Sequence, residues 1–478
     1  MAEIFPGYET HDGLALAELV RRGEVSAGEL LDAAIARIER ANPFVNAVIA
    51  PLYDRARNAI AAGLPQGPFA GVPFLLKDLG QMLPGERLSF GSRLFADYVP
   101  DRVSTLTARY LAAGLVVAGK TNTPELGCSI TTEPALFGPS RNPWNLAHTP
   151  GGSSGGAAAA VAAGMVPIAH GGDGGGSIRA PAALCGIYGF KPSRARNPVG
   201  PDIGESLDGL SCNHVLSWTV RDSAAMLDAT HGPEPGDPYQ IVPPERPFRE
   251  EASRDPGPLR IALSTLGPMG VPVDSDCVAA AQEAGHLLAG MGHIVEEATP
   301  DYDADAIHLA WRILIGAILA VQIAGRAKAA GIADPLALVE PVNAAWIEEG
   351  RRRPATDYFR AEMMIQTAGR RMGAFFNRYD VLLTPAMAAP APHLGALSSG
   401  TPDLDRFYRD TFALSPFTAI FNATGGPAAS VPFGLSRGGL PIGIHIGADL
   451  GRDGTILALS GQIERTRPWR DRRPPALG

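Results

Sequence analysis

Two serines set in glycine-rich segments, together with one upstream lysine, are the residues of this chain whose types and spacing could carry out chemistry. Ser153 lies within GGSSGG at residues 151–156, and Ser177 follows a run of glycines in GGDGGGSIR at residues 171–179. Lys77 interrupts the apolar run VPFLLKDL. Glycines packed around a serine expose backbone N–H groups and let a substrate carbonyl come close. A lysine and two serines, with no obligatory histidine, indicate acyl transfer in which an amine is the base.

Other interpretations of these glycine segments are weaker. GGSSG formally matches the G-x-S-x-G nucleophile elbow of α/β-hydrolases, and HGG at residues 170–172 resembles the oxyanion motif of lipases. An elbow requires a strand immediately before its serine, but NLAHTP at residues 145–150 stands there, and HGG comes after the serine rather than before it. Neither run has the Lys-Ser/Thr of a P-loop or a complete G-x-G-x-x-G. A structural loop would account for either run alone, but not for both together with Lys77.

The elements that must position these residues follow from the hydrophobic pattern. Residues 1–65 are predicted to be helical, since SAGE at residues 26–29 is a capping box and apolar residues then recur on one helical face until Asn42-Pro43 ends the helix. Strands are predicted at residues 72–76, 115–119, 259–263, 294–295, 381–383, 429–432 and 442–446, and further helices at residues 104–113, 157–163, 275–291 and 304–375. Residues 233–258 are rich in Pro, Asp and Glu, which indicates a surface excursion. The pattern predicts an α/β fold with a mixed β-sheet and a helical cover over residues 304–375.

Composition limits the classes of partner. The chain has 478 residues and a formal net charge of −8; the length predicts one large domain or two closely packed lobes, and the charge argues against nucleic acid or an anionic membrane. Four scattered cysteines predict buried thiols in a reducing compartment rather than a zinc site. The stretch MAEIFP has no secretory signal pattern, and the longest apolar run, residues 313–321, is too short to span a bilayer. We expect a cytoplasmic protein without metal or organic cofactor; a homodimer stays open.

Together these segments resemble the amidase signature family of serine hydrolases. The matching segments are GVPFLLKD (71–78), GKTNTPE (119–125), GGSSGG (151–156), DGGGSIRAPA (173–182), CG (185–186), GFKP (189–192), FNATGGPA (421–428) and GLPIG (439–443). The resemblance extends over nearly the whole chain except residues 235–375. It implies one amidase signature domain over residues 1–478, a mixed sheet with helices on both faces. Its expected parts are an N-terminal helical region (1–65), a catalytic core (66–232), a variable substrate cover (233–375) and a C-terminal completion of the core (376–478).

The resemblance implies a catalytic triad of Lys77, Ser153 and Ser177, with Ser177 as the nucleophile and Ser153 on a cis peptide as the bridge between them. Ser177 must lose its proton during attack, and Ser153 can relay that proton to the lysine. Lys77 must be neutral to accept it, so its apolar neighbours should depress its pKa by desolvation. Asp78 would oppose that effect, and we therefore expect it to turn away or to pair elsewhere.

An oxyanion hole is expected from the N–H groups of Gly174, Gly175, Gly176 and Ser177. The family commonly has threonine where this chain has Gly172 and a variable residue where it has Gly174, which predicts extra room near the acyl carbon.

Further expectations concern other residues near the signature. Gly151, Gly152 and Arg179 are candidates for substrate contact, although an ion pair with Asp173 is the favoured role of Arg179. Cys185 and His445 are expected to be structural.

The resemblance also bears on the substrate. Within the family the chain is most similar to hydrolases of 6-aminohexanoate oligomers, through TTEP (131–134), RNPWN (141–145), AHG (169–171), PW (468–469) and RRP (472–474). This similarity implies hydrolysis of a small, neutral amide, and the apolar helices of residues 304–375 predict an uncharged pocket. Carbamates and aryl amides are equally compatible with the scaffold. Glutamine hydrolysis as one subunit of an amidotransferase is the remaining alternative.

Overall fold

A single mixed β-sheet of eleven strands runs through the molecule, in the order β1-β3-β2-β4-β6-β5-β10-β11-β9-β7-β8. The computed structural model describes residues 5–475 and 477, so the first four residues of the stretch MAEIFP lie outside it. The strands are β1 (Val48–Pro51), β2 (Pro73–Lys77), β3 (Val116–Thr121), β4 (Ile168–Asp173), β5 (Tyr188–Lys191), β6 (Cys212–Ser217), β7 (Arg260–Leu263), β8 (Ile294–Glu297), β9 (Val381–Pro385), β10 (Ala428–Leu435) and β11 (Pro441–Gly447). Parallel pairs join β2 to β3 and β4 and join β7 to β8 and β9, whereas the other pairs are antiparallel. The predicted mixed sheet is confirmed.

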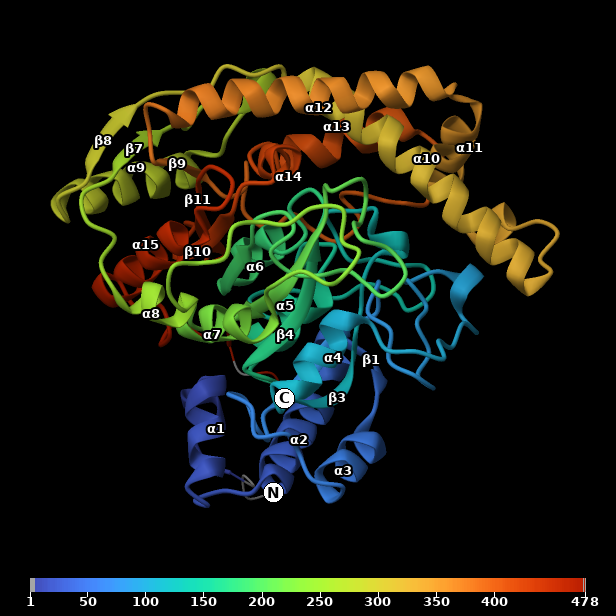
Figure 1. Ribbon diagram of the computed structural model, residues 1–478, viewed down its shortest axis with the longest axis vertical. Helices are drawn as coiled ribbons and strands as arrows, with labels where there is room; N and C mark the ends of the chain where they lie inside the picture. The colour runs from blue at the N-terminus through green and yellow to red at the C-terminus, as the bar shows by residue number, and fades with distance from the viewer. Residues whose placement is uncertain (1–4, 476, 478) are drawn as a thin grey trace.

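Helices pack on both faces of this sheet and cover one end of the molecule (Figure 1). They are α1 (Gly13–Arg21), α2 (Ala27–Val45), α3 (Tyr53–Ala61), α4 (Thr105–Ala112), α5 (Gly155–Ala162), α6 (Arg179–Cys185), α7 (Val220–Thr230), α8 (Phe248–Ser253), α9 (Ser275–Gly290), α10 (Ala304–Ala330), α11 (Pro341–Arg352), α12 (Ala355–Phe376), α13 (Leu404–Leu414), α14 (Ala419–Thr424) and α15 (Asp453–Thr466). Figure 1 shows α10, α11, α12 and α13 grouped at the opposite end of the molecule from α1, α2 and α3. Residues 304–375 therefore form the predicted helical cover, which contains three α-helices.

Strand β2 illustrates how the sheet separates two cores. Alternate side chains of a strand point to opposite faces. Leu75 packs into the cluster formed with α2, α5 and α9, whereas Phe74 and Leu76 pack into the cluster formed with α1 and α4. All three side chains are fully buried, so both faces of the sheet are covered.

The parallel pairing of β2 with β4 brings the predicted catalytic segments together. Phe74 pairs with Ile168 and Leu75 with Ala169, so both strands run in the same direction. The carboxyl ends of parallel neighbours meet at one edge of a sheet. Lys77 ends β2, and the glycine loop before Ser177 begins where β4 ends. Residues one hundred apart in the sequence thus become neighbours.

The amino-terminal region differs from its predicted boundaries. The second helix does not stop at Asn42-Pro43 but continues to Val45, with Pro43 inside it. The Asn42 side chain accepts hydrogen bonds from the N–H groups of Ala47 and Val48 at 2.8 Å, which satisfies backbone donors beyond the proline. The helix ends where Asn46 adopts a left-handed conformation (φ 48°). The region also contains β1, a strand that the helical prediction missed because it is only four residues long.

Helix α10 corrects the argument about membranes. The apolar run 313–321 is part of this 27-residue helix, which within the described residues is the one helix long and apolar enough to cross a bilayer. The shortness of the run 313–321 therefore does not exclude that this segment spans a bilayer. Half of the most apolar stretch of α10 is buried inside the protein. Leu314, Leu319 and Ile323 of this helix belong to the core shared with α11 and α12. Helix α10 is a core helix of the fold.

Candidate active site

Lys77 and Ser153 form the centre of the candidate site. Lys77 is fully buried, and its Nζ lies 2.7 Å from Ser153 Oγ and 3.1 Å from Ser154 Oγ. Strand alternation turns Lys77 to the same face as Leu75, which is the face that α5 covers. Ser154 is the N-cap residue of α5. Strand β2 therefore delivers an amine directly to the turn that begins α5.

The environment of Lys77 favours the neutral amine. Burial lowers the pKa of Lys77 to about 7, although the charge of Asp173 acts in the opposite direction. Asp78 accepts hydrogen bonds from the N–H and hydroxyl groups of Ser89 and lies 3.4 Å from Lys120 Nζ. The expectations that the pKa of Lys77 is depressed and that Asp78 pairs elsewhere are confirmed. A lowered pKa lets the amine be neutral at a lower pH than an exposed lysine, as a general base requires.

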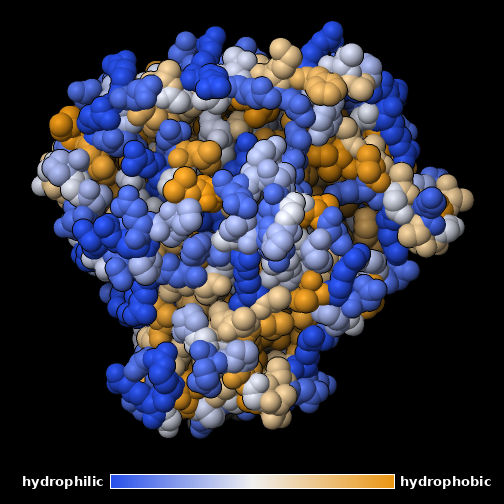
Figure 2. Space-filling model, in the orientation of Figure 1, coloured by the Kyte–Doolittle hydropathy of each residue, from blue (hydrophilic) through white to orange (hydrophobic). Residues whose placement is uncertain are grey.

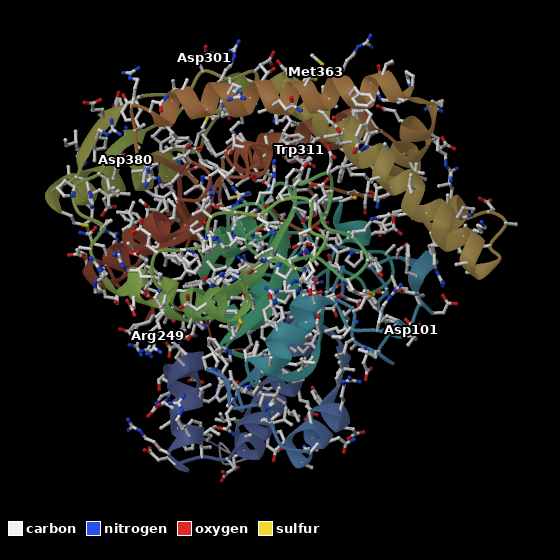
Figure 3. The ribbon with its side chains drawn as sticks, in the orientation of Figure 1. Asp101, Arg249, Asp301, Trp311, Met363 and Asp380 are labelled. Carbon is white, nitrogen blue, oxygen red and sulfur yellow. The ribbon has the colours of Figure 1, made fainter. Side chains whose placement is uncertain are left out.

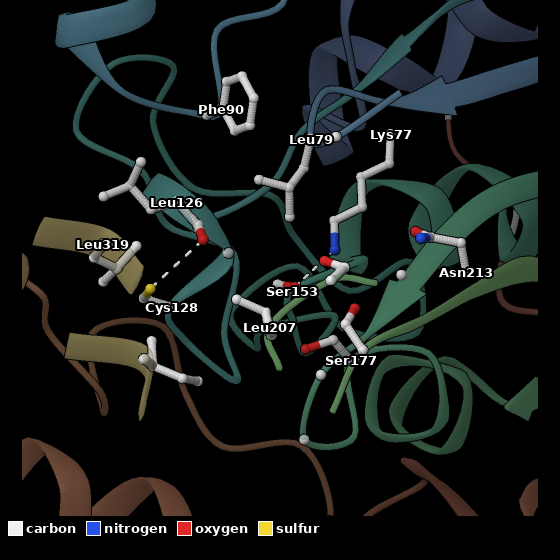
Figure 4. A pocket seen from close by; sticks show the side chains of 18 of the residues that line it. Lys77, Leu79, Phe90, Leu126, Cys128, Ser153, Ser177, Leu207, Asn213 and Leu319 are labelled. Carbon is white, nitrogen blue, oxygen red and sulfur yellow. Dashed lines mark hydrogen bonds between the residues drawn. The ribbon is translucent and has the colours of Figure 1, made fainter. Parts of the chain in front are cut away.

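The two serine segments are joined to each other. The peptide bond between Gly152 and Ser153 is cis, as the family resemblance implied. The N–H of Ser154 donates to the carbonyl of Ser177 at 3.2 Å. Figure 4 shows the side chains of Lys77, Ser153 and Ser177 close together at the wall of a cavity that all three residues line. The structure brings the three predicted residues to one place.

Asp173 organises the loop that carries Ser177. Its carboxylate accepts hydrogen bonds from the N–H groups of Gly176 at 2.7 Å and Ile178 at 3.1 Å, and it pairs with Arg179 at 2.8 Å. Burial would raise the pKa of this carboxyl, but the charge and hydrogen bonds of Arg179 outweigh it and hold the pKa well below its usual range. The predicted buried ion pair is confirmed. Arg179 is fully buried and does not line the cavity, so its place is behind the loop rather than against a substrate.

The oxyanion-hole expectation needs one correction. Because the N–H of Gly176 already donates to Asp173, this group is not available to a substrate oxygen. Gly174, Gly175 and Ser177 line the cavity, whereas Gly176 does not. The N–H groups of Gly174, Gly175 and Ser177 are therefore the remaining candidates for the oxyanion hole.

Gly151 and Gly152 allow close backbone contacts rather than forming a cavity wall. A Cβ on Gly151 would lie 2.9 Å from the backbone of Pro181, and one on Gly152 would lie 2.6 Å from the carbonyl of Thr131. Neither glycine lines the cavity. The turn that presents Ser153 is thus packed tightly from behind, which accounts for both glycines without substrate contact.

The extra room predicted at Gly172 and Gly174 is not found. A Cβ on Gly172 would lie 2.8 Å from Asn213 Oδ1, and one on Gly174 would lie 2.9 Å from the Leu207 side chain. Asn213 faces Gly172 across the β4–β6 pair, and both Asn213 and Leu207 line the cavity. The expectation was wrong because larger side chains from neighbouring segments take the space that the glycines leave.

The cavity beside Ser177 has a volume of about 360 Å³ and mostly apolar walls. Its apolar side chains include Leu79, Phe90, Leu126, Ile130, Leu207, Trp311, Ile315, Leu319, Trp346, Phe407 and Phe412. Lys77 and Asp202 are the only acidic or basic residues among the described residues that line it. Figure 2 shows hydrophobic side chains gathered beside α10, around a hollow in this face of the molecule. The predicted apolar character of the pocket is present, with Lys77 and Asp202 as the exceptions in its wall.

Two contributions to the site were missed from the sequence. Helix α13 supplies Phe407, Tyr408, Thr411 and Phe412 to the cavity; the recurrence of these residues at helical spacing could have revealed the helix. Trp311 of α10, labelled in Figure 3, donates its indole N–H to the carbonyl of Gly174 at 3.0 Å. The helical cover thus contacts the glycine loop directly, through this hydrogen bond. No sequence signal pairs these two segments.

The remaining polar candidates are structural. Cys185 is buried, burial raises the pKa of its thiol, and its sulfur lies 3.4 Å from the carbonyl of Pro150. His445 is buried beside Arg179 Nη1 at 3.1 Å and Thr384 Oγ1 at 3.4 Å. Both expectations are confirmed.

A lysine–serine pair at the end of a parallel strand pair, a glycine loop bearing a second serine and an enclosing mixed sheet are the features that the resemblance to amidases implied. The amidase family model matches residues 29–457, and the chain belongs to the amidase family. It acts as a hydrolase on carbon–nitrogen bonds.

Individual relatives give a more specific comparison than the family model does. The chain is 38% identical to the 6-aminohexanoate-cyclic-dimer hydrolase of Paenarthrobacter ureafaciens, over 98% of this chain and 97% of that protein. The solved structure of 6-aminohexanoate cyclic dimer hydrolase complexed with substrate is similar with a TM-score of 0.93 and 36% identity, over 98% of this chain and all of that chain. A bacterial aryl acylamidase of the amidase signature family is similar with a TM-score of 0.87 and 30% identity, over 96% of each chain.

Proposed function

We propose that this protein hydrolyses neutral, largely apolar amides through an acyl-enzyme on Ser177. The observation that carries the proposal is the 2.7 Å contact of the buried Lys77 amine with Ser153 Oγ, in the wall of an apolar cavity that also contains Ser177. A lysine with a pKa near 7 is suited to accept a proton at neutral pH. The relatives' activities support an amide as the bond that is cleaved.

The proposed steps use these groups in sequence. Ser177 Oγ forms a bond to the amide carbon while its proton passes to Ser153 Oγ and the proton of Ser153 passes to Lys77 Nζ. The negative charge that develops on the carbonyl oxygen is stabilised by N–H groups of Gly174, Gly175 and Ser177. When the C–N bond breaks, the leaving amine receives the proton back from Lys77 through Ser153. Water then attacks the carbonyl carbon of the acyl-enzyme and gives a proton through Ser153 to Lys77. The bond between this carbon and Ser177 Oγ breaks, Ser177 regains a proton from Lys77 through Ser153, and the acid is released.

Linear or cyclic 6-aminohexanoate oligomers are the first substrates that we propose, because the name of the relative from Paenarthrobacter ureafaciens gives hydrolysis of the 6-aminohexanoate cyclic dimer. The apolar walls suit methylene chains, and burying them would supply binding energy in proportion to the area removed from water. Aryl amides and carbamates are the alternative, which the similarity to the aryl acylamidase favours. Free glutamine fits less well, since a zwitterion would need paired charges that the cavity does not offer.

The experiment is a substrate panel with the purified chain alone. It contains linear and cyclic 6-aminohexanoate dimers, anilides, carbamates and glutamine, with Ser177→Ala as the control for contaminating hydrolases. We expect the neutral amides to be cleaved by the isolated chain and the variant to be inactive. Glutamine as the best substrate, or activity only in a complex, would favour the amidotransferase alternative and refute the proposal.

We also propose that the protein works in the cytoplasm, on small molecules and without a nucleic acid or membrane partner. All four of its cysteines are free, which suits a reducing compartment. Fractionation of cells that express the protein tests this. A homodimer remains a separate proposal, to be tested by the mass of the protein in solution.

A further inference from the structure

Two hydroxyl groups on one face of α13 lack partners. Tyr408 and Thr411 both line the cavity, and within the described part of the chain neither Tyr408 Oη nor Thr411 Oγ1 has a hydrogen-bond partner, although both atoms are buried. The Tyr408 residue is only 9% exposed. Residues three apart on a helix point to the same side. Buried polar atoms are normally paired. Two neighbouring exceptions in residues of one cavity wall indicate a polar group of a ligand that pairs with them when the wall moves to admit it.

The ring of Tyr408 is held in place by its neighbours. It lies edge-on to Trp346 with ring centroids 5.1 Å apart, and 5.2 Å from Phe412. The indole of Trp346 is in turn fixed by a 2.8 Å hydrogen bond to the carbonyl of Arg312. A ring fixed in this way loses little conformational freedom when a ligand binds.

The charges around this pair of hydroxyls select an uncharged acceptor. Burial raises the pKa of Tyr408 well above its ordinary value, so the phenol keeps its proton and can donate it. The nearby cation, Arg312, is already paired with Glu349 and Asp405. The acidic residue of the cavity, Asp202, is paired with Arg102 at 2.8 Å. A carboxylate or an ammonium group would therefore find no free counter-charge here, whereas a carbonyl oxygen would find two donors.

The position of the pair relative to the glycine loop sets a spacing. Ser415 follows α13, and its hydroxyl lies 2.8 Å from that of Thr418, which donates to the carbonyl of Gly175 at 2.6 Å. Thr411 and Tyr408 precede Ser415 by four and seven residues, which is about 6 and 10 Å along a helix of 1.5 Å rise per residue. The two residues thus lie about one and two turns along α13 from the helix end that contacts the glycine loop.

We propose that Tyr408 and Thr411 bind the carbonyl oxygen of a second, uncharged amide or related group in the substrate, while the first amide is cleaved at Ser177. This inference rests on the proposed function and adds a specificity-determining site to it. It predicts that the enzyme distinguishes diamides from monoamides of the same length, rather than recognising apolar bulk alone.

The test compares two substrates, each with wild type and with the variants. A linear diamide is compared with a monoamide of the same length in which methylenes replace the second amide, using wild type, Tyr408→Phe and Thr411→Val. We expect wild type to prefer the diamide by about tenfold in kcat/KM, the factor typical of a neutral hydrogen bond, and Tyr408→Phe to lose most of that preference. Tyr379→Phe is the matched control: its hydroxyl donates to Glu296 outside the cavity, and it should keep the preference.

The outcomes separate the inference from the proposed function. Equal effects of Tyr408→Phe on both substrates, or no preference in wild type, would overturn the inference while leaving amide hydrolysis intact. If neither substrate is cleaved, the proposed function fails instead. Direct binding of the uncleaved diamide to Ser177→Ala then still tests the site, because adding Tyr408→Phe should weaken that binding about tenfold, and unchanged binding would overturn the inference.

Discussion

Replacing Lys77 by methionine should stabilise the folded protein at low pH while removing activity. The buried amine has a pKa of about 7 in the folded protein, against 10.5 ordinarily. Between these two values the unfolded chain binds one proton more than the folded protein does, so the stability of wild type rises as the pH rises. Methionine has a similar length and no proton to lose, and the variant therefore lacks this dependence.

The magnitude follows from the two pKa values. Each pKa unit corresponds to about 1.4 kcal/mol, so the unfavourable contribution of Lys77 is about 5 kcal/mol at pH 6 and about 2 kcal/mol at pH 9. The free energy of unfolding of Lys77→Met minus that of wild type should thus fall by about 3 kcal/mol over this range. The loss of contact with Ser153 changes the difference by a constant and not its slope.

Urea unfolding at a series of pH values, followed by tryptophan fluorescence, measures this difference. Ser177→Ala is the matched control, since it changes the same site without removing a titrating group, and its difference from wild type should be flat. In parallel, kcat/KM of wild type should rise with pH and level off above about 7. A flat difference for Lys77→Met, or an activity profile that rises only near pH 10, would refute the assignment of Lys77 as a buried, neutral base.

Three further predictions concern neighbouring groups. Ser177→Ala should abolish labelling by a fluorophosphonate probe, whereas Ser153→Ala should slow it; labelling that survives in Ser177→Ala and disappears in Ser153→Ala would reverse the two roles. Arg179→Met should destabilise the protein by about 3–5 kcal/mol in urea unfolding, since it leaves the carboxylate of Asp173 buried without its partner; a neutral result would contradict the role of this pair. Burial raises the pKa of Glu125 from 4.5 to about 7, so the folded protein binds its proton more tightly and wild type should lose roughly 2.5 kcal/mol relative to Glu125→Gln between pH 5 and 8. A pH-independent difference would show that this carboxyl is ionised throughout.

Much of the architecture was predictable because hydrophobic periodicity is a local property. The strands β2, β3, β7, β8, β9, β10 and β11 and the helices of the cover were predicted near their observed positions, whereas β1, β4, β5 and β6 were not predicted. The errors fell where tertiary contacts override local preference. Asn42 continues a helix past a proline by satisfying donors that follow it, and β1 is a strand only because β3 pairs with it.

Part of the chemistry of the site could be predicted from the sequence. The lysine, the two glycine-embedded serines and the Asp173–Arg179 pair could each be named from residue types and motifs, since an acyl-transfer site needs a nucleophile, a base and closely approaching backbone. The depressed pKa of Lys77 was also expected from its apolar neighbours in β2. These features depend on a few adjacent residues.

Only the tertiary structure decided which of these groups are free to meet a substrate. The N–H of Gly176 is taken by Asp173, and Arg179 lies behind the loop. The space beside Gly172 is filled by Asn213 from a neighbouring strand, and Tyr408 reaches the cavity from a helix more than two hundred residues away. Sequence patterns record what a segment contains, whereas the availability of a donor or of a volume depends on which distant segment packs against it.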